Sequence, residues 1–80
     1  MIYTQNTMDE INLLAQFNLS TTFEGIKIHQ HTASETLVNA AQRLYDKGLI
    51  TQKDGGYLTH LGREAAEHAQ MLLRLLEPIK

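Results

Sequence analysis

The chain has 80 residues, no cysteine and a formal net charge of −2, which predicts one small domain whose core is not stabilised by disulfides. The acidic balance argues against broad electrostatic attraction to nucleic acid. Because no apolar run is long enough to cross a membrane and the first residues are too polar for a signal peptide, we expect a cytoplasmic protein.

Three longer helices are predicted from apolar residues at helical spacing. The first is expected over 7–17, with Met8, Ile11, Leu14 and Ala15 on its apolar face and Asn6 or Thr7 as its cap. The second is expected over 33–47, behind a capping box that Thr32 opens and Glu35 completes. The third is expected over 60–77, where Pro78 ends it.

Two shorter segments lie between the first and second of these helices. Thr21 and Glu24 have the spacing of a capping box, which predicts a short helix over 20–25 that Gly25 ends. Residues 26–29 alternate apolar and polar side chains, a pattern that fits a short strand and a loop equally well.

A hairpin is predicted over 49–58. Gly48 closes the preceding helix, because glycine accepts the left-handed conformation found just after many helices. The pair Asp54-Gly55 between two short extended runs is a strong hairpin signal. Thr59 then supplies a capping oxygen for the last helix. A helix, a hairpin wing and a closing helix predict a mainly α protein with a small β wing, an α+β fold of the winged helix-turn-helix type.

The run Gly48-Leu49-Ile50, followed by the hairpin and then by Leu58-Thr59-His60-Leu61-Gly62-Arg63, resembles the wing region of bacterial winged-helix regulators. The chain also resembles a small family of uncharacterised bacterial proteins described as DNA-binding. The resemblance implies one winged-helix domain over 1–80, with the 33–47 helix as recognition helix, and a function in binding double-stranded DNA, as in transcription regulation.

Side chains able to contact DNA lie on the expected recognition helix, the wing and the start of the last helix. Between Gln42 and Arg63 there are four basic and two acidic residues, a local balance of +2. Asn39, Gln42 and Arg43 can bond base edges, and the others suit phosphates. The candidate DNA-binding residues are Ser34, Thr36, Asn39, Gln42, Arg43, Lys47, Gln52, Lys53 and Arg63.

The last helix has an apolar stripe that widens toward its C-terminal end. The stripe either packs on the first helix of the same chain or pairs with a second subunit, since exposed leucine clusters usually find a partner. In a homodimer the interface residues would be Ala69, Leu72, Leu73 and Leu76.

No motif predicts an enzyme or a cofactor. The glycines are isolated or sit in the hairpin, and no cysteine nucleophile exists. His29 and His31 could form half of a zinc site, but exposed histidines in a polar connector are the more common case, so no metal is predicted. The leading hypothesis is a DNA-binding regulator, and the alternative is a winged-helix module that binds another protein without DNA.

Overall fold

The fold is α+β, as the sequence predicts. The computed structural model describes residues 3–29 and 31–78, so the predicted domain over 1–80 includes residues 1–2, 30 and 79–80, which lie outside the described residues. The described part contains three helices and three short strands, in the order α1 Gln5–Leu14, β1 Ile26–Lys27, α2 Glu35–Asp46, β2 Ile50–Gln52, β3 Gly55–Leu58 and α3 His60–Leu75. The strands form one antiparallel sheet in the order β1-β3-β2.

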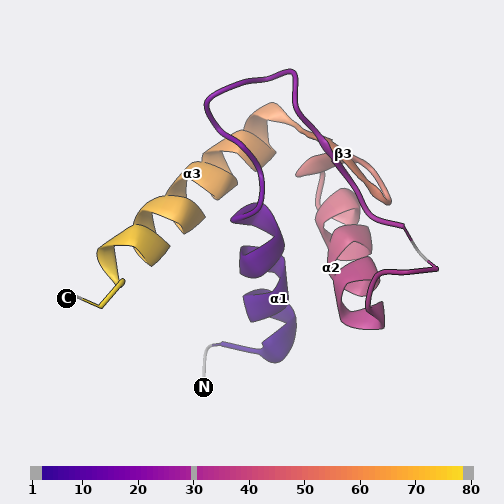
Figure 1. Ribbon diagram of the computed structural model, residues 1–80, viewed down its shortest axis with the longest axis horizontal. Helices are drawn as coiled ribbons and strands as arrows, with labels where there is room; N and C mark the ends of the chain where they lie inside the picture. The colour runs from indigo at the N-terminus through magenta and orange to yellow at the C-terminus, as the bar shows by residue number, and fades with distance from the viewer. Residues whose placement is uncertain (1–2, 30, 79–80) are drawn as a thin grey trace.

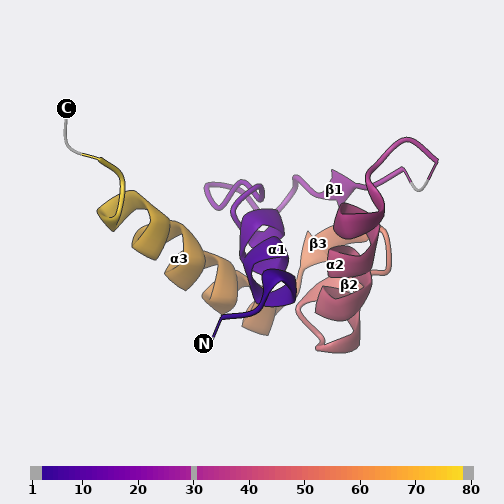
Figure 2. The same cartoon turned by 90° about the horizontal axis from the view of Figure 1, so that it is seen from below.

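Helix α1 lies between α2 and α3 in both views (Figures 1 and 2), and the sheet lies beside α2. Apolar side chains of all three helices, the sheet and the segment after α1 meet in a single core, which removes their apolar surface from water. The buried members of this core are Leu13, Leu14, Phe17, Ile28, Ala40, Ala41, Leu44, Ile50 and Ala66.

Helix α1 begins and ends earlier than the predicted 7–17. Its cap is Thr4, whose hydroxyl accepts a hydrogen bond from the Thr7 amide at 3.1 Å, so the predicted caps at Asn6 and Thr7 are wrong. After Leu14 the backbone tightens, because the amides of Gln16 and Phe17 bond to carbonyls three residues back instead of four.

The helix predicted over 20–25 does not form. Side chains in this segment bond to nearby backbone and so compete with helical hydrogen bonds. Asn18 Oδ1 accepts from the amide of Ser20 at 3.0 Å, and Thr21 Oγ1 accepts from the amide of Phe23 at 3.1 Å. Glu24, predicted to complete a capping box with Thr21, instead accepts a hydrogen bond from the Asn18 amide group.

The sequence of residues 26–29 fits a strand and a loop equally well. In the structure Ile26 and Lys27 form a strand of two residues, because they pair with Gly56 and Gly55 of β3. The next segment turns at His29, whose carbonyl accepts from the amides of Thr32 and Ala33. Helix α2 therefore starts two residues later than the predicted 33–47. Its cap is Ser34 instead of Thr32, and the Ser34 hydroxyl accepts from the Leu37 amide at 3.2 Å.

Gly48 ends α2 as predicted. Its φ is +76°, and the amides of Gly48 and Leu49 bond back to the carbonyls of Tyr45 and Leu44, the pattern of a Schellman motif. The hairpin predicted over 49–58 forms as β2 and β3, but its turn is Lys53-Asp54 and both following glycines belong to β3. The register shifts by one residue between the Ile50–Leu58 and Gln52–Gly55 pairs, and this bulge falls where Gly56 has positive φ.

Thr59 caps α3 as predicted, because its hydroxyl accepts from the Gly62 amide at 3.0 Å and donates to the Gly48 carbonyl at 2.7 Å. The helix ends at Leu75 instead of the predicted residue 77, since the residue before Pro78 is pushed away from helical geometry. None of the helices in the described part of the chain has the length and apolar content needed to cross a bilayer.

Candidate interaction surfaces

A buried carboxylate joins α1 to α2. Glu10 lies on α1 with a side chain only 10% exposed, and Arg43 Nε of α2 donates to Glu10 Oε2 at 2.9 Å. Lys47, just after α2, donates to the other carboxylate oxygen. Burial would raise the pKa of Glu10, but the hydrogen bonds and charges of Lys47 and Arg43 outweigh it and hold the pKa below its ordinary value.

This ion cluster changes the role of two predicted DNA-binding residues. The sequence predicts that Arg43 contacts a base and Lys47 a phosphate, yet both side chains point toward Glu10 on α1. The Arg43 side chain is 27% exposed, so most of it is unavailable to a ligand, whereas that of Lys47 is 56% exposed. The one carboxylate that they share balances one of their two positive charges.

The outward face of α2 presents mostly amide, hydroxyl and acidic groups. Ser34 caps the helix, Thr36 and Asn39 are exposed, and Gln42 donates to Asp46 at 2.9 Å. Glu35 and Asp46 are exposed at the two ends of the same face. A duplex laid on this face would therefore meet two carboxylates, which repel phosphate.

The hairpin tip is tied to β1. Lys27 forms an ion pair with Asp54, and the hydrogen bond and charge of Lys27 hold the pKa of Asp54 below its ordinary value. Gln52 and Lys53 are exposed at the end of the hairpin. Among the described residues, Lys53 forms no ion pair, so its charge is available to an anionic partner.

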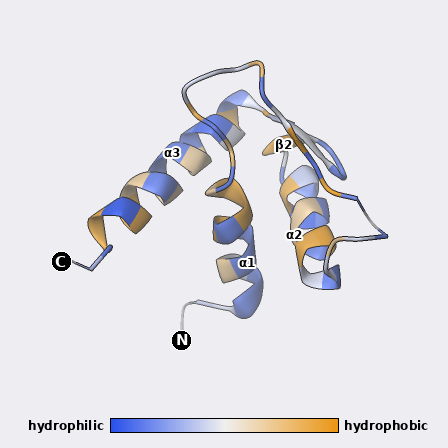
Figure 3. Cartoon of the chain, viewed as in Figure 1, coloured by the Kyte–Doolittle hydropathy of each residue, from blue (hydrophilic) through white to orange (hydrophobic). Residues whose placement is uncertain are grey.

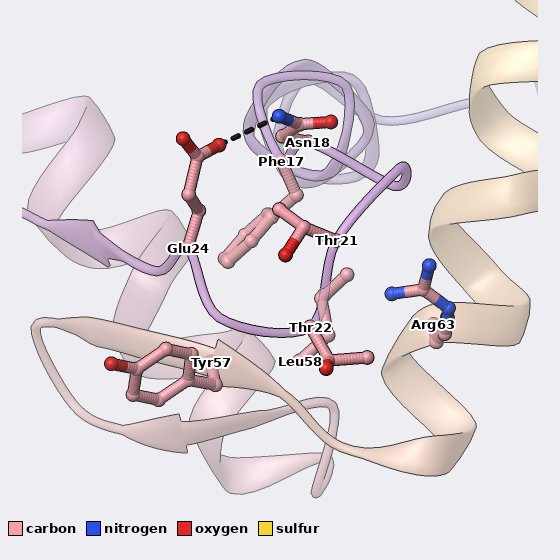
Figure 4. A pocket seen from close by; sticks show the side chains of 8 residues that line it. All are labelled: Phe17, Asn18, Thr21, Thr22, Glu24, Tyr57, Leu58 and Arg63. Atoms are coloured by element: carbon pink, nitrogen blue, oxygen red, sulfur yellow. Dashed lines mark hydrogen bonds between the residues drawn. The ribbon is translucent and has the colours of Figure 1, made fainter.

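Arg63, the last of the predicted DNA-binding residues, belongs to a small cavity that the sequence does not reveal (Figure 4). It donates to the Leu19 carbonyl, so the side chain fixes the loop after α1. The cavity lies between this loop, β3 and the start of α3, and its volume of about 20 Å³ admits little more than one water. The lining side chains are Phe17, Asn18, Thr21, Thr22, Glu24, Tyr57, Leu58 and Arg63.

The C-terminal part of α3 points away from α2 and the sheet in both views (Figures 1 and 2). Gln70 donates to the carbonyls of Phe17 and Leu14 at 2.8 and 3.2 Å and so fixes the middle of α3 to the end of α1. Beyond it lies a group of exposed apolar residues that we call the apolar end of α3. It comprises Met71, Leu72, Leu73, Leu75 and Leu76. Their apolar character colours much of the last turns of α3 orange in Figure 3.

Exposure of the apolar end is large for side chains of this type. The exposed fraction rises from 39% for Leu73 to 72% for Leu75, while Ala69, one turn earlier, is packed against the core. The predicted interface residues Leu72, Leu73 and Leu76 thus lie together on free surface, and Ala69 lies at the edge of the core. Contiguous apolar surface of this kind marks an interaction site more often than a packing accident.

Fold and surfaces define a small α+β protein with a polar, partly acidic α2 face and a projecting apolar helix end. The chain belongs to a family of unknown function (DUF5669), whose model matches residues 1–77. No curated protein and no solved structure matches the chain. In the described residues, no group of three histidine or acidic side chains is placed to hold a metal ion.

Proposed function

We propose that this is a winged-helix protein that works by binding another protein through the apolar end of α3. The winged-helix part of the proposal is supported by the order of elements. Helix α2 leads directly into the β2–β3 hairpin, α3 follows the hairpin, and β1 pairs with the hairpin strand β3. The helix expected at 20–25 is missing, so the usual pair of helices before a wing is reduced to α2 and the turn at His29.

The observation that carries the proposal is the exposure of the apolar end. Burying each of these leucines against a partner would contribute roughly 1.5–3 kcal/mol for a fully buried side chain, and less in proportion to what α3 already covers. By contrast, two of the cations that a DNA-binding surface on α2 would need are bound to Glu10. The exposed apolar surface therefore favours a protein partner over DNA.

A photo-reactive amino acid in place of Leu75 tests the proposal in the native cell. We expect irradiation to join the protein to a partner chain, because Leu75 is the most exposed member of the apolar end. The same substitution at Glu35, which is exposed on α2, is the control and should give no adduct. Adding Leu72→Glu should abolish the Leu75 adduct, and a Leu75 probe that joins nothing would contradict the proposal.

Binding of duplex DNA is the second function that a specific observation favours. Thr36 and Asn39 are exposed on α2, and Lys53 is exposed and free of ion pairs among the described residues. A helix and a wing tip on one chain can contact base edges and phosphates together.

Fluorescence anisotropy of a mixed-sequence duplex at several salt concentrations tests this second function. If α2 and the wing bind DNA, affinity should fall steeply with salt, and Lys53→Gln should lower the slope of log affinity against log salt by about one. Glu67→Gln, a change on the exposed part of α3, is a control that leaves Lys53 in place. Absence of binding at low salt, by protein shown to be folded, would exclude DNA as the ligand.

A further inference from the structure

The apolar stripe on α3 has an internal order. Ala65, Ala69, Leu72 and Leu76 follow one another at steps of four, three and four residues, the spacing of a helix-pairing seam. The two alanines are partly buried against the core, and the two leucines are 53% and 69% exposed. Small side chains therefore occupy the first half of the stripe and large ones the second.

This sequence of small and then large side chains matches a second copy of α3 that runs in the opposite direction. The midpoint of the stripe lies between Gln70 and Met71. If a second copy of α3 runs antiparallel with the midpoints aligned, Leu72 faces Ala69 of the second copy and Leu76 faces Ala65. Each leucine then fills the space above an alanine, which satisfies the close packing of protein interiors. A parallel pair would oppose leucine to leucine and leave a gap between the alanines.

The charged side chains of this segment lie outside the seam and do not oppose the pairing. From Ala65 to Leu76 the charged residues are Glu67 and Arg74. They are seven residues apart and lie on one face of α3, opposite the stripe, because each residue turns the helix by about 100°. Gln70 is directed toward the carbonyls of Leu14 and Phe17 and so stays out of the seam.

The exposed leucines supply the surface for a small interface between two copies. Leu72 and Leu76 on the stripe are 53% and 69% exposed, and Leu73 and Leu75 flank them, whereas Met71 lies on the opposite face and stays outside the pair. Two copies that pair along the stripe would therefore form an interface at or below the lower limit of about 1,000 Å² for a specific protein interface. A two-fold axis uses the same patch on both copies, so the pair needs no second complementary surface.

We infer that the partner of α3 is a second copy of this chain, paired antiparallel about a two-fold axis at the level of residues 70–71. The inference rests on the proposed function, because it names the protein that the apolar end binds. It makes the interface a closed dimer, in which Leu72 and Leu76 of each copy pack on alanines of the other.

Light scattering on purified protein tests the partner. We expect twice the mass of one chain, and the mass of one chain for Leu72→Glu. Leu61→Glu is the matched control, since Leu61 is 55% exposed on the same face of α3 but lies one turn before the paired segment 65–76, and it should leave the dimer intact. Circular dichroism verifies that both variants fold. A wild-type chain that is monomeric at every concentration would overturn the inference, while a Leu75 photo-adduct to a different protein would still support the proposed function.

Disulfide cross-linking tests the direction, and the cysteine-free chain allows single cysteines to be introduced. In the antiparallel pair the two residues 76 are separated by about 16 Å along the helix axis, well beyond disulfide reach. Leu76→Cys alone should therefore not cross-link, whereas a mixture of Ala65→Cys and tagged Leu76→Cys should form a mixed disulfide under mild oxidation. Self-linking of Leu76→Cys, or no mixed disulfide, would overturn the antiparallel arrangement.

Discussion

Replacing Glu10 with glutamine is expected to lower the free energy of unfolding by about 2 kcal/mol at pH 7. Removing one partner of a buried ion pair typically costs about 3–5 kcal/mol, and we discount this because Lys47 is more than half exposed and screened by solvent. Glutamine keeps the size of the side chain, so packing around α1 should change little. Urea unfolding followed by circular dichroism measures the difference.

The effect of this substitution should depend on pH. Because the folded pKa of Glu10 lies below its ordinary value of 4.5, the unfolded chain takes up the proton first as the pH falls. The stabilisation is thus complete above about pH 5 and is lost as the pH falls through the folded pKa. Wild type and Glu10→Gln should therefore converge in strong acid, whereas a gap that stays constant from pH 7 to the acid range would contradict the role of the charge.

Glu67→Gln is the matched control for this series. It makes the same chemical change on an exposed part of α3, where no ion pair is found among the described residues. Surface substitutions of this kind usually change stability by no more than about 0.5 kcal/mol. An equal loss in both variants would show that the cluster of Glu10, Arg43 and Lys47 contributes nothing specific.

Gly62→Ala is expected to lower the free energy of unfolding by roughly 3 kcal/mol, the upper end of the range for overpacked sites. A Cβ at this position would overlap the backbone carbonyl of Leu49, and neither backbone can move without shifting α3 against β2. For a domain of this size, such a loss lowers the melting temperature by roughly 4–8 °C per kcal/mol. Thermal unfolding measures it directly.

Gly48→Ala separates this clash from a general effect of adding a methyl group. Gly48 has positive φ, but a Cβ there meets no atom within 4 Å. Its cost should be limited to the strain of the left-handed conformation, about 1–2 kcal/mol. A Gly62→Ala variant no less stable than Gly48→Ala would mean that α3 does not approach Leu49 as closely as the structure has it.

Local signals in the sequence predicted the second half of the chain well. Gly48 ends α2 through its own backbone conformation, and Thr59 starts α3 through its own hydroxyl. Both roles can therefore be recognised from the neighbouring sequence. The segment after α1 was predicted wrongly, because Thr21 and Glu24 fit a capping box but Asn18 captures the Glu24 carboxylate. That competition depends on a loop geometry that spacing alone does not reveal.

The sequence does not reveal the role of Glu10, for a related reason. An acidic residue near the start of a predicted helix is commonly explained by the helix dipole. Yet Glu10, Leu13, Leu14 and Phe17 have the spacing of one helical face, and all four are buried. Met8, expected on the apolar face, is 49% exposed. A charge on a buried stripe calls for an opposite charge elsewhere, but only the structure identifies Arg43 and Lys47, more than 30 residues away.

The projecting part of α3 is already helical in the single chain. Thr59 and the packed first turns supply the costly nucleus of the helix, and the residues beyond Ala69 are mostly leucine, methionine and arginine, which favour helix without tertiary support. A binding element that is already rigid gives up little conformational entropy when it docks. Association through this surface should therefore resemble the meeting of two preformed bodies, with no folding step to slow it.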